Sequence, residues 1–334
     1  MGRPKIIHTG GLLSLPDGNQ VDAIAPVIIS ASRATDIPAF FPLWFSNRLK
    51  AGYMRWTNPF NAKQVQYVSF QNTRVVVFWS KNPKPLFRYL PELDERGINY
   101  YFQFTLNDYE KECLEPNVPS LLQRVESFKE LAERVGKKRV IWRFDPLLLS
   151  DAVTIERLID RISFLAYLLQ GYTEKLVISF ADIRQYRHVQ HNLVRQQMNY
   201  REFSREQMAG FAERLIHLNR EWGLKIATCA EEITLAGIEH NRCIDDTLMV
   251  ELFRNDNDLM SFLGYRPDLF GEQPSLSYRK DKGQRKACGC IVSKDIGMYN
   301  TCNHLCTYCY ANQSGAAVQN NLKKHNPESE TLIA

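Results

Sequence analysis

Three cysteines near the end of the chain, Cys302, Cys306 and Cys309, carry the most specific chemistry in this sequence. Thiolates spaced by four and then three positions can wrap one corner of an iron–sulfur cubane and bind three of its irons. The fourth iron then has no ligand from this loop. The spacing therefore predicts a [4Fe–4S] cluster with one iron open to another ligand.

An open iron of this kind indicates radical chemistry. In radical enzymes the amino and carboxylate groups of S-adenosylmethionine (SAM) chelate such an iron, and an electron from the cluster cleaves the sulfonium to release a 5′-deoxyadenosyl radical. Tyr308 stands just before the last cysteine, where radical SAM enzymes usually have an aromatic residue. We expect Tyr308 to help bind the cofactor. The alternatives are a zinc site with His304 or a distant thiolate as fourth ligand, or an incidental cluster of thiols.

Four further cysteines predict a second site. Cys288 and Cys290 form a C-x-C turn, which is too short for an unstrained disulfide but can offer two thiolates to one metal. Cys229, at the end of an expected strand, and Cys243 complete a set of four. We expect an auxiliary [4Fe–4S] cluster here, with a structural Zn²⁺ as the alternative, because four thiolates suit both. Cys113, in a polar loop, is assigned to neither site.

The composition indicates the compartment in which these thiols act. Of 334 residues, 44% are hydrophobic and 24% are charged, which is the balance of a soluble globular protein. The sequence has neither an apolar run near the roughly 20 residues of a membrane span nor a signal peptide, so we expect a cytoplasmic protein. In that reducing compartment, clustered cysteines are more often metal ligands or catalytic groups than disulfides. The net charge of +5 is far below that of a dedicated nucleic-acid binder.

Short, nearly continuous apolar runs alternate with amphipathic helices through most of the chain. Such runs are typical of parallel strands that are covered on both faces. We expect strands at residues 27–32, 75–80, 100–105, 140–144, 176–180 and 225–229, with shorter ones at 54–57 and 65–70.

The helices between these strands have clear boundaries. An apolar stripe over 121–135 predicts a helix that stops at Gly136, and a second helix is expected over 154–169. Ser204 begins another helix with a capping box, and Gly223 ends it. Repeated strand–helix units predict an α/β fold with a parallel sheet, as a complete or partial (β/α) TIM-like barrel. An open doubly wound sheet is the alternative.

Polar residues gather where the expected strands end, which is where (β/α) barrels carry their chemistry. Arg143 is next to last in an apolar run, and a buried arginine costs several kcal/mol unless it is paired; Asp145 is its nearest partner. We expect a pocket lined by such residues, although polar loops and helix caps would explain some of them. The predicted catalytic residues are Arg33, Lys81, Arg143, Asp145 and Glu231.

Long motifs through the chain carry a family resemblance. They stand at residues 29–38 (ISASRATDIP), 78–83 (FWSKNP), 140–146 (VIWRFDP), 228–231 (TCAE), 243–245 (CID) and 293–302 (SKDIGMYNTC). In these stretches the chain, from about residue 27 to 312, resembles domain-of-unknown-function family 1848. The resemblance implies a C-terminal cysteine cluster like the N-terminal cluster of radical-SAM enzymes, and it implies little else about function.

The position of the cysteine loop differs from that in radical-SAM barrels, where the loop normally follows the first strand. If residues 291–296 form a last strand beside residues 27–32, the chain is a circular permutation of that barrel. The Gly-Gly-Glu strand that normally holds the SAM amino group is missing, and Glu231 or Asp145 is expected to replace it.

The expected organisation follows from these elements. Residues 1–26 form an N-terminal extension with a tight turn at 16–18, and 27–285 form the barrel. Residues 286–317 form an Fe–S segment packed on the barrel, and 318–334 a flexible tail.

We therefore expect a radical SAM enzyme that acts on an unknown substrate. Its partners would be SAM and a reductant such as flavodoxin or ferredoxin, with no membrane; a nucleic acid or nucleotide remains open as substrate. The alternative is a non-catalytic binding protein stabilised by Fe–S or Zn, in which both cysteine groups are structural.

Overall fold

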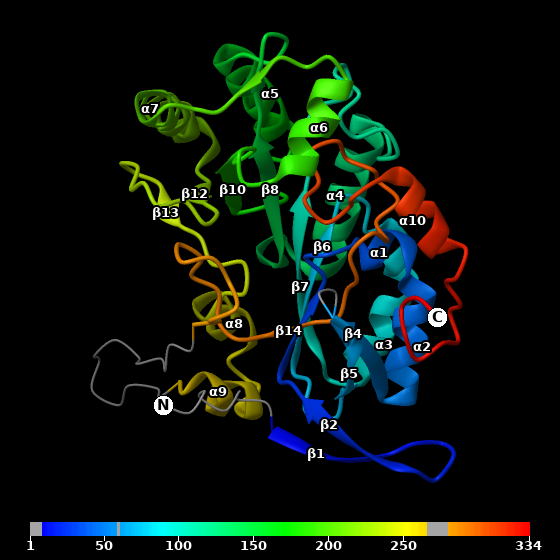
Figure 1. Cartoon of the computed structure of the whole chain (residues 1–334). Helices are drawn as coiled ribbons and strands as arrows, with labels where there is room; N and C mark the ends of the chain where they lie inside the picture. Colours follow the sequence, from blue (N-terminus) through cyan, green and yellow to red (C-terminus); the bar gives the residue numbers. More distant parts are fainter. Residues whose placement is uncertain (1–8, 59–60, 266–279) are drawn as a thin grey trace, which may run out of the picture.

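The computed structural model describes residues 9–58, 61–265 and 280–334, and its centre is an eight-stranded parallel sheet (Figure 1). The order across the sheet is β13-β12-β10-β8-β7-β6-β3-β14. The strands are β3 (Ile28–Ala31), β6 (Val75–Ser80), β7 (Asn99–Thr105), β8 (Val140–Leu147), β10 (Lys175–Phe180), β12 (Lys225–Thr228), β13 (Glu239–His240) and β14 (Lys294–Asp295). The six longer strands confirm those expected from the apolar runs.

Neighbouring strands follow one another in the sequence, except that β14 lies beside β3. A doubly wound sheet would reverse its order near the middle, so that alternative is wrong. The strand expected at residues 291–296 does pair with β3, but only over Lys294 and Asp295. Among the described residues β13 and β14 are opposite edges with no pairing between them, so these strands form a parallel α/β sheet without closing a barrel.

One face of the sheet is covered by the crossover helices (Figure 1). Alternate strand residues such as Phe78, Phe102 and Trp142 point into this main core, because successive side chains of a strand face opposite sides. The helices are α1 (Ile37–Phe40), α2 (Pro42–Ala51), η1 (Lys84–Tyr89), α3 (Leu90–Glu95), α4 (Leu121–Val135), η2 (Lys137–Arg139), α5 (Ile155–Leu168) and α7 (Arg205–Trp222). The capping box at Ser204 and the glycine ends of α4 and α7 are confirmed.

The other face is covered by two short helices, α8 (Asp246–Phe253) and α9 (Asn257–Leu263). They lie on the side of the sheet away from α2, α3 and α4 (Figure 1). Val75, Val77 and Tyr101 pack against them in a second apolar cluster that also contains three of the predicted metal-ligand cysteines. The amino-terminal half of this face is therefore filled with apolar side chains, and its polar residues lie toward the carboxyl ends of the strands.

The N-terminal extension is more regular than expected. β1 (Thr9–Ser14) and β2 (Gln20–Ala25) form a hairpin, and the expected tight turn is present, with Gly18 at φ +86°. The two shorter predicted strands are confirmed as β4 (Tyr53–Asn58) and β5 (Asn61–Ser69), but they belong to a separate sheet of order β1-β2-β5-β4.

The C-terminal residues differ from the expected flexible tail. After α10 (Gly315–Leu322) the chain runs along α2 and β4, where the Trp44 indole N–H donates to the Ser329 carbonyl at 3.0 Å. The Tyr53 hydroxyl donates to Glu330 at 2.6 Å, and Leu332 is buried. The polar composition of this segment concealed its packing, because most of its contacts are made by backbone carbonyls.

The remaining elements lie near the carboxyl ends of the strands. These are α6 (Arg187–Arg195) and a small antiparallel pair, β9 (Leu149–Ser150) with β11 (Tyr200–Arg201). No helix in the described ranges is both long enough and apolar enough to cross a lipid bilayer.

Candidate functional site

The cysteine loop begins directly after β14, at the carboxyl end of β3. Asp295 fixes its start by accepting hydrogen bonds from the Ser30 hydroxyl at 2.7 Å and from the Arg33 amide at 2.8 Å. Gly297 then passes so close to β3 that a Cβ atom at this position would lie 1.8 Å from the Ser32 Oγ. From here the chain rises to the upper end of the sheet, next to α1 and α6 (Figure 1).

The three thiols of the loop lie together in a largely buried turn. The Cys309 amide donates to the Cys306 carbonyl at 3.0 Å, and Leu305, between Cys302 and Cys306, has φ +54°. The Ala311 amide donates to the Cys309 sulfur at 3.4 Å. Burial, and the charge that neighbouring sulfurs would carry, raise the pKa of Cys302 and Cys306. A bound cation would offset both effects.

His304 lies inside this loop but is engaged elsewhere. Its Nε2 is 2.8 Å from a carboxylate oxygen of Asp36, and its Nδ1 is 3.3 Å from the Asn117 carbonyl. The ring also packs edge-on against Phe40. Because both nitrogens already have partners, His304 is not a free fourth ligand, and a zinc site built on it is not favoured.

Tyr308 and Lys81 meet in a buried polar network beneath the loop. The Lys81 ammonium donates to Glu115 at 2.7 Å and to the Tyr308 hydroxyl at 3.0 Å, and that hydroxyl donates to Glu115. Arg124 is a second cation on the same carboxylate, 3.3 Å from Glu115. Burial opposes ionisation of Glu115, but Lys81 and Arg124 hold its pKa below the ordinary value.

Sequence reasoning missed Glu115 and Arg124. A signal was present, because Arg124 interrupts the apolar stripe of α4 and its side chain is 1% exposed, so it needed a buried carboxylate. Lys81 was predicted to face a substrate. The structure instead directs it to Glu115 and near the Cys306 sulfur, where its charge opposes the effect of burial on the thiol pKa.

The predicted pair of Arg143 and Asp145 is present. Arg143 Nε donates to Asp145 at 3.1 Å, and Nη1 donates to the Gln103 side-chain oxygen at 3.1 Å. Asp145 also accepts from the Ser179 hydroxyl. The Asp145 amide donates to Asn107 at 2.8 Å, and Asn107 donates to the Tyr308 hydroxyl at 3.0 Å. Asp145 thus lies between the cysteine loop and Arg143, at the same end of the sheet.

Arg33 and Glu231 flank this centre. The Arg33 guanidinium lies 5.2 Å from the centre of the Trp79 ring, and its backbone carbonyl accepts from the Tyr310 hydroxyl at 2.7 Å. Glu231 accepts from the Phe180 amide at 3.0 Å, and burial raises its pKa. The side chains of Arg33 and Glu231 therefore have fewer polar partners than those of Lys81, Arg143 and Asp145.

The second set of cysteines also converges. The sulfurs of Cys229 and Cys243 are 3.6 Å apart, and the Cys290 sulfur accepts from the Cys243 amide at 3.2 Å. Cys288 lies beside Cys290, which lowers the pKa of Cys288 to about 7. Within the described ranges, no three His, Cys, Asp or Glu side chains already surround a single ion-sized position.

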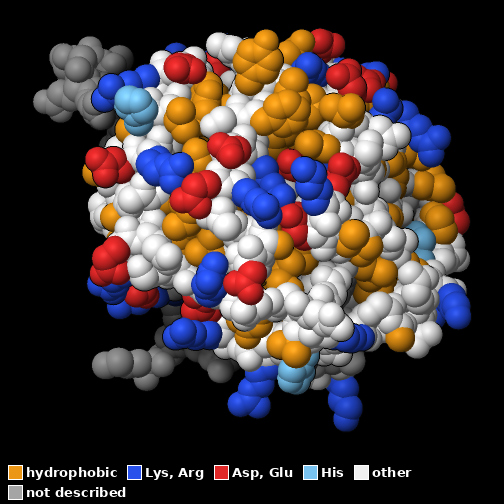
Figure 2. All heavy atoms as spheres, turned by 90° about the horizontal axis from the view of Figure 1, so that it is seen from above, with side chains coloured by type: hydrophobic (Ala, Val, Ile, Leu, Met, Phe, Trp, Pro, Cys, Tyr) orange, Lys and Arg blue, Asp and Glu red, His pale blue; other side chains and the backbone are white. Residues whose placement is uncertain are grey.

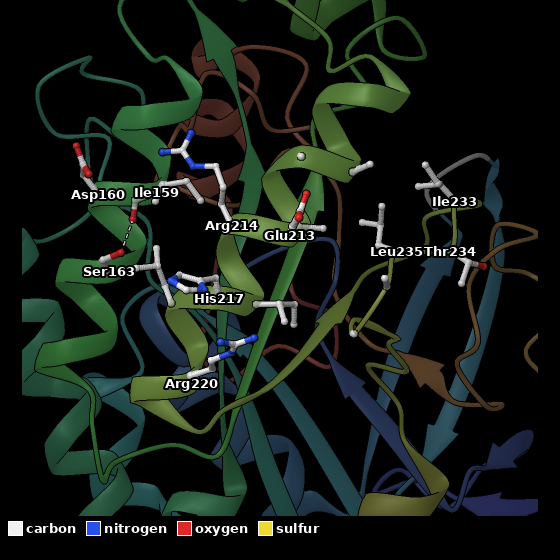
Figure 3. A pocket seen from close by; sticks show the side chains of 17 residues that line it. Ile159, Asp160, Ser163, Glu213, Arg214, His217, Arg220, Ile233, Thr234 and Leu235 are labelled. Carbon is white, nitrogen blue, oxygen red and sulfur yellow. Dashed lines mark hydrogen bonds between the residues drawn. The ribbon is translucent and has the colours of Figure 1, made fainter.

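A groove lies elsewhere on the molecule. It has a volume of about 1060 Å³ and lies between α5, α7 and residues 233–237, with Asp160, Glu213 and His217 among its lining (Figure 3). None of the predicted site residues lines it. Several of the polar residues at the strand ends, such as Arg143 and Asp145, are hydrogen-bonded to one another.

The fold and the site define a class: an α/β protein on one parallel sheet, with two groups of cysteines at the carboxyl ends of its strands. Residues 28–311 match the family described as Domain of unknown function (DUF1848), and the chain belongs to this family. No curated protein and no solved structure matches it.

Proposed function

We propose that this chain is an iron–sulfur protein and a radical SAM enzyme, with Cys302, Cys306 and Cys309 as ligands of a [4Fe–4S] cluster. The observation that carries the proposal is the set of three thiols on one loop, one buried and two partly buried, whose only histidine is already paired. Three thiolates with no fourth ligand from the loop suit a cluster with one open iron. Zinc in a structural site would need a fourth protein ligand.

The neighbouring residues fit such a cluster. When bound, it would supply the electron that cleaves SAM to a 5′-deoxyadenosyl radical. Lys81 brings a positive charge near the sulfurs, and the Ala311 amide donates to one of them; both would stabilise thiolates. A reductant such as flavodoxin or ferredoxin would deliver the electron.

Glu231 is the better carboxylate for the SAM amino group. Asp145 already accepts from Arg143 and Ser179, whereas Glu231 accepts one backbone hydrogen bond. We assign Lys81 and Arg143 to positioning the two cysteine groups, and we keep Arg33 and Glu231 as the residues nearest to an incoming substrate.

The strand order supports a partial (β/α) barrel as the framework. β14 is the edge strand of the sheet and lies next to β3. The cysteine loop, which follows β14, therefore comes after the strand at the β3 end of the sheet, although β14 is the last strand in the sequence. This is the arrangement expected of a circularly permuted radical-SAM barrel, with the loop and Arg143 at the same end of the strands.

The non-catalytic alternative is a metal-stabilised binding protein, possibly for nucleic acid, and the charge of the surface bears on it. The upper face of the molecule mixes cationic, anionic and apolar side chains and has no broad basic field (Figure 2). Such a surface does not favour nucleic-acid binding, which needs clustered positive charge.

The test is anaerobic reconstitution with iron and sulfide, followed by reduction with dithionite and addition of SAM. We expect SAM to change the EPR spectrum of the reduced cluster and to yield 5′-deoxyadenosine. The triple variant C302A/C306A/C309A should lose both responses, and C113S, which alters an exposed cysteine outside both groups, should keep them. An iron-loaded protein with no spectral change and no cleavage would overturn the enzyme proposal.

A further inference from the structure

Backbone hydrogen bonds bring cysteines from three separate segments to one place. The Cys229 amide extends the β12–β10 ladder by donating to the Ile178 carbonyl at 2.8 Å. The Asn241 amide donates to the Thr228 carbonyl at 2.8 Å, just before Cys243. The turn that holds Cys288 and Cys290 is tied by the Ile291 amide, which donates to Ile244 at 3.2 Å. Convergence from such distant segments is a property of the fold and not of a local motif.

The sulfurs of this group accept several hydrogen bonds. Cys243 accepts from Arg143 Nη1 at 3.0 Å and from the Asn241 side-chain amide at 3.3 Å. Cys290 accepts from the amides of Cys243 and Ile244 at 3.2 and 3.4 Å. A neutral thiol is a weak acceptor, whereas a metal-bound thiolate is the acceptor that such donors normally support.

The burial of Arg143 strengthens this argument. Its side chain is 4% exposed, and its carboxylate partner Asp145 also accepts from Ser179. A hydrogen bond from the guanidinium to a neutral thiol would offset little of the free-energy cost of burying that charge. Against a thiolate it forms a charge-assisted hydrogen bond.

The sulfur spacing is also that of metal ligands. The 3.6 Å between Cys229 and Cys243 is far beyond a disulfide bond length of about 2.05 Å. It is close to the edge of about 3.8 Å in a tetrahedron with Zn–S bonds of about 2.3 Å. The four sulfurs do not yet surround one point, so binding would complete the set by side-chain rotation.

We infer that Cys229, Cys243, Cys288 and Cys290 form a closed four-thiolate metal centre, separate from the cysteine loop, with Arg143 as its positioning residue. Zinc and an iron–sulfur cluster share this ligand chemistry. The centre has a structural task, because the Cys243 carbonyl also accepts from Tyr101 at 2.7 Å and from Gln103 at 3.0 Å and so joins the second layer to the sheet. This inference does not depend on SAM chemistry.

The first experiment measures zinc, iron and sulfide in anaerobically purified full-length protein and in C243S/C288S. We expect this variant to lose one zinc, or about four irons, while C113S keeps the wild-type content. One zinc per chain identifies a single ion, and four irons with sulfide identify a cluster; either supports the centre. The triple variant C302A/C306A/C309A should keep this metal. Failure of the cysteine-loop proposal can therefore be distinguished from failure of the four-thiolate centre.

The second measurement does not require a variant to fold. Native wild-type protein is alkylated with iodoacetamide before and after chelation, and the modified cysteines are mapped by mass spectrometry. We expect Cys229, Cys243, Cys288 and Cys290 to be protected until the metal is removed, while exposed Cys113 reacts throughout. Equal alkylation of Cys288 with and without the chelator, or an unchanged metal content in C243S/C288S, would overturn the inference.

Arg143→Gln tests the positioning role. Removing this donor should weaken metal binding about 10- to 100-fold in competition with a chelator, the range typical of partners that contact a ligand. Arg143→Lys keeps the charge and should recover part of the loss. Equal metal affinity in wild type and R143Q would show that the contact with Cys243 is only incidental.

Discussion

Glu115 is the residue on which the buried charges beneath the cysteine loop depend. It accepts from Lys81 and Tyr308 and lies 3.3 Å from Arg124, with its own side chain 3% exposed. Two cations therefore share one carboxylate in a site with little water. Removing such a carboxylate destabilises the protein mainly because it leaves buried cations without a counter-charge, and less because the attraction itself is lost.

Glu115→Gln should destabilise the protein by about 3–5 kcal/mol, because Lys81 and Arg124 would lose their shared counter-charge in the interior. The measurement is urea unfolding at neutral pH. Glu130→Gln is the matched control: its side chain is 33% exposed and it also pairs with two cations, yet its loss should cost only about 0–1 kcal/mol. Similar losses in both variants would contradict the assignment of Glu115 as a buried counter-ion.

The same carboxylate should make the stability difference depend on pH. Because the folded pKa of Glu115 is below the ordinary 4.5, its ionisation stabilises the fold above that pH, and the stabilisation is lost as the pH falls through the folded value. The difference between wild type and E115Q should be constant from about pH 6 to 7 and shrink below about pH 4.5. A difference that grows on acidification would mean that the folded pKa is raised.

At this scale the sequence predicted some contacts and missed others. The Arg143–Asp145 pair could be predicted because a cation within an apolar run requires a nearby carboxylate. Arg124 in the apolar stripe of α4 signals a buried carboxylate partner, but it does not identify Glu115. Glu115 and Asn107 stand in an irregular segment between β7 and α4 with no periodicity to show which side chains turn inward. The seven cysteines proposed as metal ligands were singled out by their spacing and compartment, but nothing in that spacing reveals Arg143 as a donor to Cys243.

At the scale of elements, β14 decides where the cysteine loop goes. It is only two residues long, so its position depends on Asp295 and on the close passage of Gly297 over Ser32. The hypothesis of a last strand at residues 291–296 beside residues 27–32 anticipated the pairing with β3, but not that only Lys294 and Asp295 form the strand. The contacts that fix the loop are side-chain hydrogen bonds across 262 and 265 positions, which periodicity cannot show.

Gly297→Ala should displace the loop, because the added Cβ would lie 1.8 Å from the Ser32 Oγ. Ser32 caps its own turn by accepting from the Ala34 amide at 2.9 Å, so it cannot move freely. We expect a loss of about 1–3 kcal/mol in urea unfolding, the range for overpacking, and a lower iron content after reconstitution.

Gly210→Ala is the control for this change. Gly210 is exposed in α7, and a Cβ there would meet nothing within 4 Å, so alanine should stabilise the helix by about 1 kcal/mol. If G297A and G210A behave alike, the close contact at Ser32 does not constrain the loop.

At the scale of the whole molecule, the two faces of the sheet are held in different ways. The helix-covered face has a large apolar core that includes Phe78, Phe102 and Trp142. Among the described residues, the second face is covered by α8, α9 and the cysteine-bearing turns, in a smaller cluster. The nearly continuous apolar runs predicted that both faces would be buried, but they could not predict that the cover of one face would come from residues after the last crossover helix.

The C-terminal tail shows a similar limit. Its polar composition predicted fraying, yet backbone carbonyls of Ser329 and Glu330 accept hydrogen bonds from Trp44 and from the Arg55 amide. Composition reports side chains and does not report where backbone groups find partners.

If the four-thiolate centre fastens the second layer, removing its metal should loosen that layer and leave the other face intact. Hydrogen exchange of the wild-type protein, measured by mass spectrometry with and without a chelator, should show faster exchange in residues 229–263 and 280–291. Exchange in α4 and α5 should be unchanged, because their apolar face packs into the main core without contact with these cysteines. The triple variant C302A/C306A/C309A, with the loop cluster absent, should respond to the chelator in the same residues. Uniform acceleration across both faces would mean global destabilisation, and no change in residues 229–263 would mean that the layer is held by its apolar contacts alone.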